Sequence, residues 1–499
     1  MAPMRAFFAA AVVACSCTPS PSFRPPSPED ALLPPVDDGP AWATSALAAE
    51  LDEKTLSVER TGNRVTLLVN GKESFAQRYF NADGADLILV KTFIFSDDET
   101  GRRVAALLSG RARAGAYVVL QYDVKGSIAG AHDVNEMLAN QTPSLPAGER
   151  NIIRGMREAG VIIVPTNSPT RGAEAREWAH NVERLLRDPQ AAVERSAQTL
   201  KLLNHCDHEK YWITGRRDAA GKLELSAILG GMNIASEYAY GGTDRIDAGT
   251  GRGGWRDTDI EVRGPVVNDI VDRFFAVMDY HLGVAKADHA RWNPPQAPAG
   301  QARCRFVWNH PLVRQGHAIE ELYRILIDAT PPGSAVRLET AYFSPTKRLR
   351  KALRSALERG ARVTVLSNSD ETNDISVVAD AGRAAYLAFL EIDGVLALFE
   401  RLVRHDLGEG TLHSKVASFG TTGPIIVGSA NLDAQSALHN SEGVLLIFDP
   451  AARAGFDAMF GADLTNDRAT RVTRETVTKD TRWERFRQWG AEHVGWYWL

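Results

Sequence analysis

The sequence predicts an α/β protein built from two duplicated halves that together form one active site. The first observation is that a His-x-Lys triplet occurs twice, at residues 208–210 and at residues 413–415. The second is that each triplet is followed by a glycine-rich turn that contains an asparagine, Asn233 or Asn431. The third is a strand-helix-strand pattern that also recurs. Because two separate patterns repeat, an internal duplication is indicated.

Hydrophobic periodicity predicts the elements of each half, and the folded region is expected to start near residue 60. In the first half, the expected elements are a strand at 65–69, a helix at 72–80, a buried strand at 86–95, a helix at 102–114 and a strand at 117–122. In the second half, they are a strand at 336–343, a helix at 349–358 and a strand at 362–367, followed by Asn368. Strand, helix and strand with short connections predict right-handed β-α-β units with parallel strands.

The length of 499 residues accommodates two ordinary domains or one duplicated unit. We predict a signal segment at 1–17, a Pro-rich tether at 18–59, a first half at 60–285, a Pro-rich linker at 286–300 and a second half at 301–499. The formal net charge is -5, and proteins that depend on attraction to the phosphate backbone are usually basic. No nucleic-acid partner is therefore expected.

The N-terminus is typical of an export signal. Arg5 precedes an apolar run at 6–14 that is too short to span a bilayer as a helix. Small residues before Cys15 resemble a bacterial lipoprotein signal, in which the lipid is attached to that cysteine. An ordinary secretory signal is the alternative. Lipid anchoring at Cys15 would hold the protein at a membrane surface in the bacterial periplasm, and Ser16 favours the outer membrane.

Two other features leave alternatives open. Cys206 and Cys304 either pair in an oxidising compartment or are separate buried thiols. The C-terminal tail carries aromatic residues that fit a membrane interface or a helix packed on the core. These residues are Trp483, Phe486, Trp489, Trp496, Tyr497 and Trp498.

The repeated His, Lys and Asn residues suit chemistry at phosphorus. One imidazole can attack phosphorus while a second protonates the leaving oxygen. Lysine ammonium and asparagine amide groups can hold the non-bridging oxygens and stabilise the developing charge. If each His-x-Lys lies on a strand, both side chains share one face. No compact metal-ligand cluster stands out, and no cofactor is expected.

With these motifs, the chain resembles the phospholipase D superfamily and, within it, the bacterial cardiolipin synthase-like branch. The resemblance covers about residues 60–499. It extends over residues 204–205, 230–238, 255–259, 342–345, 367–374 and 428–433, with Ser436, Asn440 and Glu442. It implies two phospholipase D-like α/β/α sandwich halves that share one active site.

The resemblance also implies residue roles in a two-step reaction through a phosphohistidine. It implies that His208 is the nucleophile and His413 the acid and base, an order that the sequence alone does not fix. Phosphate would be bound by Lys210, Lys415, Asn233 and Asn431, and the same motif places Ser429 in the site. Each histidine needs a carboxylate on its other nitrogen. The match gives Asp257 to His208, with Glu237 as a competitor, and gives Glu442 to His413.

One departure concerns the aspartate that the family motif has five residues after each lysine. This chain has Gly215 and Gly420 at those positions. The family aspartate is thought to support the loop, so we expect activity to survive its loss.

Three functions are considered. The resemblance favours a phosphatidyltransferase or phospholipase acting on a glycerophospholipid substrate, with cardiolipin synthesis from phosphatidylglycerol as one form. A periplasmic phosphodiesterase or nuclease would use the same site chemistry. An inactive membrane-anchored scaffold is the third. Whether water or an alcohol is the acceptor, which headgroup is preferred and what the oligomeric state is all stay open.

Overall fold

The computed structural model describes residues 39–129, 147–167, 205–246, 253–283, 289–311, 317–374, 396–402 and 410–474, with short pieces between 382 and 390. The predicted signal segment with Cys15 and the C-terminal aromatic tail lie outside these residues. No helix within the described ranges has the length and apolarity needed to cross a membrane.

The first half is a mixed sheet with helices on both faces. Its strands are β1 (Arg60–Val69), β2 (Leu87–Thr92), β3 (Tyr117–Asp123), β4 (Ile162–Thr166), β5 (Tyr211–Arg217), β6 (Leu223–Gly230) and β7 (Thr258–Arg263). Its helices are α2 (Asn70–Ala82), α3 (Glu99–Arg113), α4 (Val124–Ala129), α6 (Ala147–Glu158), α9 (Ser236–Ala239) and α10 (Val266–Leu282).

The second half repeats this plan. Its strands are β8 (Ala302–Asn309), β9 (Ala335–Thr340), β10 (Phe343–Ser344), β11 (Arg362–Asn368), β12 (Leu396–Arg401), β13 (Lys415–Phe419), β14 (Ile425–Gly428), β15 (Leu432–Asp433), β16 (Glu442–Phe448) and β17 (Ala469–Val472). Its helices are α11 (Ala318–Ala329), α12 (Lys347–Glu358), α14 (Ala434–Leu438) and α15 (Pro450–Asp463).

Sheet topology confirms the predicted duplication. The strand order is β1-β7-β6-β5-β2-β3-β4 in the first half and β8-β16-β14-β13-β9-β11-β12 in the second. Taken in chain order, the strands of the two halves occupy equivalent places. The β2-α3-β3 and β9-α12-β11 units are the predicted parallel pairs. The two sheets are joined where β1 and β8 pair antiparallel, with Arg60 opposite Cys304.

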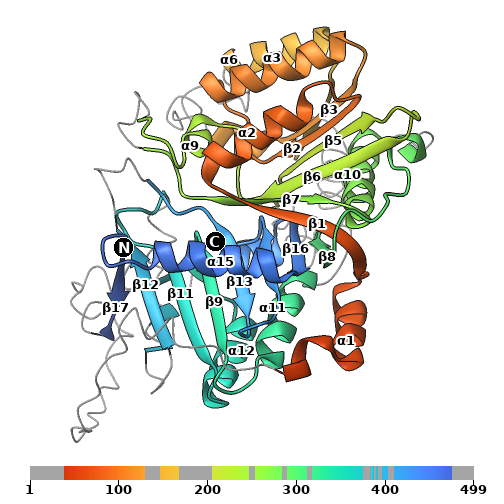
Figure 1. Cartoon of the computed structure of the whole chain (residues 1–499). Coiled ribbons are helices and arrows are strands. Elements are labelled where there is room, and N and C mark those ends of the chain that lie inside the picture. Colours follow the sequence, from red (N-terminus) through yellow and green to blue (C-terminus); the bar gives the residue numbers. More distant parts are fainter. Residues whose placement is uncertain are drawn as a thin grey trace, which may run out of the picture.

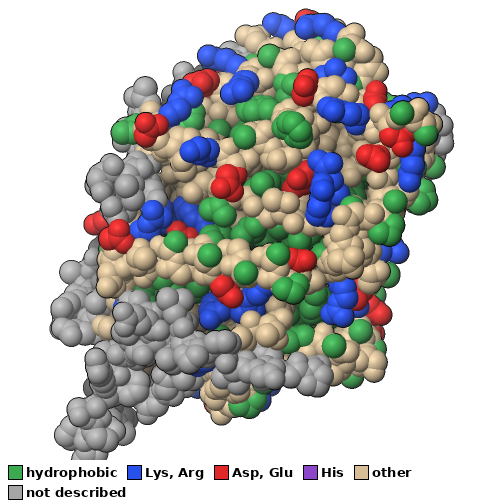
Figure 2. Space-filling view, viewed as in Figure 1, with side chains coloured by type: hydrophobic (Ala, Val, Ile, Leu, Met, Phe, Trp, Pro, Cys, Tyr) green, Lys and Arg blue, Asp and Glu red, His purple; other side chains and the backbone are tan. Residues whose placement is uncertain are grey.

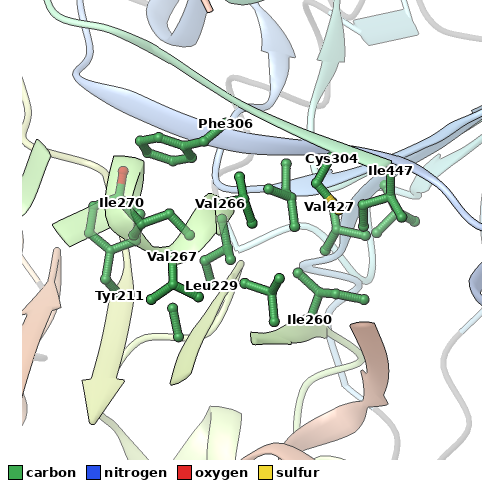
Figure 3. Packing of buried hydrophobic residues seen from close by; sticks show 14 of the residues in the cluster. Tyr211, Leu229, Ile260, Val266, Val267, Ile270, Cys304, Phe306, Val427 and Ile447 are labelled. Atoms are coloured by element: carbon green, nitrogen blue, oxygen red, sulfur yellow. The ribbon is translucent and has the colours of Figure 1, made fainter. Parts of the chain in front are cut away.

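The two sheets also pack face to face. Figure 1 shows α2, α3 and α6 covering one outer face, and α11 and α12 covering the other. Between the sheets, α10 contacts β8 of the opposite half and α15 contacts β1. The apolar layer between them contains Leu229 and Ile260 from the first half, with Val427 and Ile447 from the second (Figure 3). Because burial of apolar area drives association, this shared core fixes how the halves meet.

Charged side chains are interspersed on the described part of the face in Figure 2, where Lys and Arg alternate with Asp and Glu. On that face the described surface therefore presents a mixed charge pattern, in keeping with the formal net charge of -5.

The tether prediction for residues 18–59 is wrong from residue 39 onward. A 3-10 helix at Gly39–Ala43 leads into helix α1 (Ser45–Thr55), whose N-terminus is capped by Thr44. Leu47 and Leu51 have helical spacing and are buried against the second half, together with Trp42. The Pro-rich composition further upstream obscured this short amphipathic helix.

The described part of the predicted linker, residues 289–300, packs closely on the first half. Within its described part, a 3-10 helix spans His289–Trp292. The Trp292 ring stacks on Tyr117 at 4.8 Å. Gln296 accepts a hydrogen bond from the amide of Leu225 and donates one to the carbonyl of Leu223.

The alternative of separate thiols is confirmed for the two cysteines outside the signal segment. Cys206 and Cys304 are both free, and Cys304 is fully buried at the junction of the two sheets.

A substitution in helix α1 tests whether this helix belongs to the folded region. Leu51 is 1% exposed, so Leu51→Ala should lower the free energy of unfolding by about 2–5 kcal/mol through the cavity it leaves. The measurement is urea denaturation followed by circular dichroism. Leu56→Ala is the matched control, because Leu56 is 64% exposed and should have a much smaller effect. Equal, small effects of both substitutions would contradict a folded α1.

Candidate active site

Both His-x-Lys triplets lie just ahead of a strand, where the two halves meet. His208 precedes β5, and Lys415 is the first residue of β13, so the expectation that each whole triplet lies on a strand is wrong. The backbone of each histidine is bonded to the other half instead. The His208 amide donates to the Ser441 carbonyl at 2.9 Å, and the His413 amide donates to the Arg256 carbonyl at 2.7 Å. The two triplets are therefore brought into one shared site.

The carboxylate partners of the histidines are exchanged relative to the prediction. Nδ1 of His208 lies 2.9 and 3.0 Å from the carboxylate oxygens of Glu442. Nδ1 of His413 lies 2.8 Å from Oδ2 of Asp257. The pairing of Asp257 with His208 and of Glu442 with His413 is therefore wrong, although all four residues belong to the site.

The exchange follows from the backbone bonds between the halves. Ser441 pairs with residues 206–208 of the first half, so the next residue, Glu442, reaches His208. Arg256 pairs in the same way with residues 411–413, which places Asp257 beside His413. Glu237 has the same sequence offset from its histidine as Glu442 has, but it lies on α9 and does not take the position that Asp257 fills.

Glu442 is held as a carboxylate by several donors. Ser429 Oγ donates to it at 2.5 Å, Ser436 Oγ at 2.8 Å and Asn440 Nδ2 at 3.2 Å. Burial acts to raise the pKa of Glu442, but His208 and the other neighbouring donors outweigh it and hold the pKa below its usual value. The structure thus places Ser429 in the site, as a support for Glu442.

Asp257 has fewer donors than Glu442, and its pKa is shifted in the opposite direction. Its Oδ1 accepts from the Thr258 amide at 2.7 Å. Burial raises the pKa of Asp257 to about 7, although Lys415 opposes the shift. Gly231 occupies the place that Ser429 has in the other half, and a Cβ there would come within 2.2 Å of Oδ1 of Asp257. The two histidine-carboxylate pairs are alike in geometry, and the pKa values of their carboxylates are shifted in opposite directions.

The two lysines lie beside their own histidines. Lys210 Nζ donates to the His208 carbonyl at 2.7 Å, and Lys415 Nζ lies 2.7 Å from Nδ1 of His413. Burial lowers the pKa of Lys210 to about 7 and that of Lys415 to about 8. A bound phosphodiester would add negative charge between them and favour the protonated forms.

Both histidines are buried and favour the neutral form. Burial lowers the pKa of His208, against the opposing effect of Glu442. For His413, burial together with Lys415 and Lys210 moves the pKa well below its usual value. A carboxylate on Nδ1 leaves Nε2 of each imidazole for a substrate.

The two asparagines differ in their environment. Asn233 Oδ1 accepts from the amides of Phe93 and Ile94 at 3.2 and 3.0 Å, and its Nδ2 donates to Tyr238. Asn233 thus braces the turn after β2, and its predicted contact with phosphate stays a prediction. The Oδ1 of Asn431 is buried and, within the described part of the chain, has no hydrogen-bond partner.

The last residues of β3 and β11 form a pair of supports that the sequence analysis did not identify. Asp123 Oδ2 accepts from the Asp207 amide at 2.7 Å, and Asn368 Oδ1 accepts from the Leu412 amide at 2.9 Å. Asp207 and Leu412 are the residues immediately before the two histidines. The signal was present in the sequence, since a polar residue ends the equivalent strand in each half.

The glycines that replace the family aspartate have local packing reasons. A Cβ on Gly215 would lie 2.8 Å from Cδ2 of Leu225, so a side chain there would require the neighbouring leucine side chains to shift. Gly420 follows β13 with φ +70, and its carbonyl accepts from Arg453 at 2.6 Å. Gly215 lies within β5, after Lys210, and Gly420 lies just past the end of β13, after Lys415. The described residues contain no group of three His, Cys, Asp or Glu placed to hold a metal.

The exchanged pairs can be tested by NMR of protein labelled with ¹⁵N in histidine. Glu442→Gln should shift the ring nitrogen signals of His208 and leave those of His413 nearly unchanged, because His208 is the histidine that Glu442 contacts. Asp257→Asn should do the reverse. Glu237→Gln is the control and should move neither. A response of His413 to Glu442→Gln, with His208 unmoved, would contradict the exchange.

The buried lysines predict a stability that depends on pH. The folded pKa of Lys210, about 7, is below its unfolded value, so the folded state binds fewer protons and stability rises between about pH 7 and pH 10. Lys210→Met removes the cost of burying a charged ammonium group and should stabilise the protein at pH 7 by about 1–3 kcal/mol, a gain that shrinks toward pH 10. The measurement is urea denaturation at several pH values. Lys222→Met, in the exposed turn between β5 and β6, should show no such trend.

Comparisons with known proteins agree with the fold. The family model described as "Cardiolipin synthase, PLD-like domain" matches residues 324–464. A Bacillus subtilis (strain 168) protein named "Probable cardiolipin synthase YwiE" is 25% identical over 406 residues, which is 81% of this chain and 66% of that protein. Cardiolipin synthase A of Pseudomonas syringae pv. syringae (strain B728a) is 26% identical over 451 residues, 88% of this chain and 78% of that protein.

A solved structure shows the same fold. The crystal structure of phosphatidylserine synthase from Haemophilus influenzae Rd KW20 superposes with a TM-score of 0.58 at 13% identity, covering 87% of this chain and 95% of that one. The predicted α/β fold with two duplicated halves is therefore confirmed. The sequence matches thus make this chain similar to cardiolipin synthase-like proteins of the phospholipase D superfamily, and the solved structure adds agreement in fold.

Proposed function

We propose that the protein is a phospholipase D-type phosphatidyltransferase that acts on glycerophospholipids through a phosphohistidine intermediate. The observation that carries this proposal is the pair of buried imidazoles, each with Nδ1 on a carboxylate of the opposite half and each beside a buried lysine. Such a site has two nitrogens available for reaction at one phosphorus and two cations for its oxygens. The relatives named as cardiolipin synthases support the choice of a lipid substrate.

In the first step, Nε2 of His208 attacks phosphorus of the substrate phosphodiester. The nitrogen-phosphorus bond forms as the bond to the leaving alcohol oxygen breaks, and that oxygen takes the proton from Nε2 of His413, which enters the step as the imidazolium with Nδ1–H on Asp257 and leaves it neutral. The imidazole of His208 gains positive charge when it is phosphorylated. Glu442, held ionised by its donors, stabilises that charge through Nδ1.

The difference between the two carboxylates supports this order of roles. A nucleophilic histidine that becomes cationic needs a partner that stays ionised, and Glu442 has a lowered pKa. Asp257 has a pKa of about 7, so the His413 pair exchanges a proton readily near neutral pH. His208 is therefore assigned as nucleophile and His413 as general acid, then general base.

In the second step, an acceptor hydroxyl attacks the phosphohistidine and His413 takes its proton. Water as acceptor gives phosphatidic acid. The hydroxyl of a second phosphatidylglycerol gives cardiolipin, with glycerol released in the first step. We favour the lipid alcohol because the relatives are named for that synthesis.

The proposal is tested with purified protein and phosphatidylglycerol vesicles, with products followed by mass spectrometry. Cardiolipin plus glycerol should form, and both should be lost in His208→Ala and in His413→Ala. His289→Ala, in the segment between the halves, is the control and should retain activity. Formation of phosphatidic acid alone would mean that the protein is a hydrolase and not a synthase. Cleavage of DNA or of bis-p-nitrophenyl phosphate, without any lipid product, would overturn the lipid substrate.

A further inference from the structure

The two sides of the shared site differ in polarity at equivalent positions. β2 and β9 occupy the same place in their halves, and each ends in a threonine whose Oγ1 donates to the carbonyl two residues further on. These bonds are Thr92 to Ile94 at 2.7 Å and Thr340 to Tyr342 at 3.0 Å. Ile94 and Tyr342 are therefore structural equivalents, and a hydrophobic residue on one side corresponds to a phenol on the other.

The His208 side has an apolar rim. Phe93 packs edge-on to the His208 ring, with ring centroids 4.9 Å apart. Phe93 and Ile94 are both partly exposed, and Asn233 fixes their backbone amides. This rim suits contact with the apolar part of a lipid.

The His413 side has a polar rim. The Tyr342 hydroxyl donates to both carboxylate oxygens of Asp374, at 2.7 and 2.9 Å. Tyr342 is partly exposed and Asp374 is exposed. In the second half the chain leaves β11 in a turn that carries Asp374, whereas in the first half helix α4 follows β3 directly and carries no carboxylate.

Backbone register ties this polar pair to the reacting groups. Thr340, two residues before Tyr342, pairs directly with Lys415. The charge of Asp374 acts on Lys415 and on Tyr238. The Tyr238 ring packs edge-on to the His413 ring at 5.1 Å. Asp374 therefore lies on the side of the site where His413 acts as the base.

A carboxylate repels a phosphate anion and accepts hydrogen bonds from hydroxyl groups. We infer that Tyr342 and Asp374 form a subsite for an acceptor that carries more than one hydroxyl group, such as the glycerol headgroup of a lipid. The inference rests on the proposed function. One hydroxyl donates to Asp374 while a second hydroxyl gives its proton to Nε2 of His413. The oxygen-phosphorus bond of the acceptor forms as the nitrogen-phosphorus bond to His208 breaks.

The test measures how the intermediate partitions between three acceptors in one assay. Full-length protein is incubated with phosphatidylglycerol vesicles, deuterated glycerol and ethanol. Transfer to glycerol appears as deuterated phosphatidylglycerol, transfer to ethanol as phosphatidylethanol and hydrolysis as phosphatidic acid. In Asp374→Asn, the ratio of glycerol transfer to hydrolysis should fall about tenfold, because a hydrogen bond to a charged group is weakened. The ratio of ethanol transfer to hydrolysis should stay the same, since ethanol has no second hydroxyl.

Two further variants sharpen the result. Tyr342→Phe should lower the glycerol ratio in the same direction, because it removes the donor that orients Asp374. Asp218→Asn removes one exposed carboxylate in the turn between β5 and β6 and should change neither ratio. Equal loss of glycerol and ethanol transfer in Asp374→Asn, or no change in either, would overturn the subsite. Wild-type protein that forms phosphatidic acid alone would instead overturn the transferase itself, and the subsite with it.

Discussion

The site depends on the exchange of backbone and carboxylate contacts between the two halves. Ser441 of one half and Arg256 of the other each bond to the segment that carries the opposite histidine. The residue after each then supplies the carboxylate that orients that histidine. Both of these histidine-carboxylate pairs are formed between the halves. The chemistry is therefore inseparable from the packing of the two sheets, which is maintained by their common apolar layer.

Buried ion pairs lie next to the segments that carry the two histidines and support the contacts made there. Lys91 lies 2.8 Å from Asp207, and Arg273 lies 2.8 Å from Glu209. On the other side, Arg256 reaches across the halves to Asp463 at 2.7 Å. Buried ion pairs contribute little net stability, but a charge left without its partner costs about 3–5 kcal/mol. The Arg256–Asp463 pair therefore opposes sliding of one half past the other, while the pairs of Lys91 and Arg273 hold the segment that carries His208 within the first half.

The halves have the same topology and have diverged in chemistry. Glu442 is stabilised as an anion, whereas Asp257 is near its point of half-protonation at neutral pH. Asn233 is committed to bracing the backbone, whereas Asn431 has an amide oxygen without a partner in the described structure. An apolar rim beside His208 faces a polar rim beside His413. Such asymmetry suits a two-step reaction with a distinct donor and acceptor, because the two histidines perform different tasks.

The sequence by itself determined the duplication, the β-α-β unit of each half and the main residues of the site. Repeated motifs and apolar periodicity carry that information locally, so the residue pattern is enough to name His208, Lys210, His413 and Lys415. The amphipathic helix α1 was missed because the surrounding composition is rich in Pro, Ser and Ala. The supports Asp123 and Asn368 were not identified because the polar residue that ends each equivalent strand gives no indication of which backbone amide it accepts from.

Only the tertiary structure decided which carboxylate serves which histidine. Glu442 and Glu237 have equal offsets from the histidines of their own halves, and sequence distance favours partners within one half. The true pairing is made between halves by backbone bonds that join segments more than 150 residues apart, as for the His413 amide and the Arg256 carbonyl. The pKa values followed from the same packing, since burial and the number of donors around each carboxylate depend on the assembled interface.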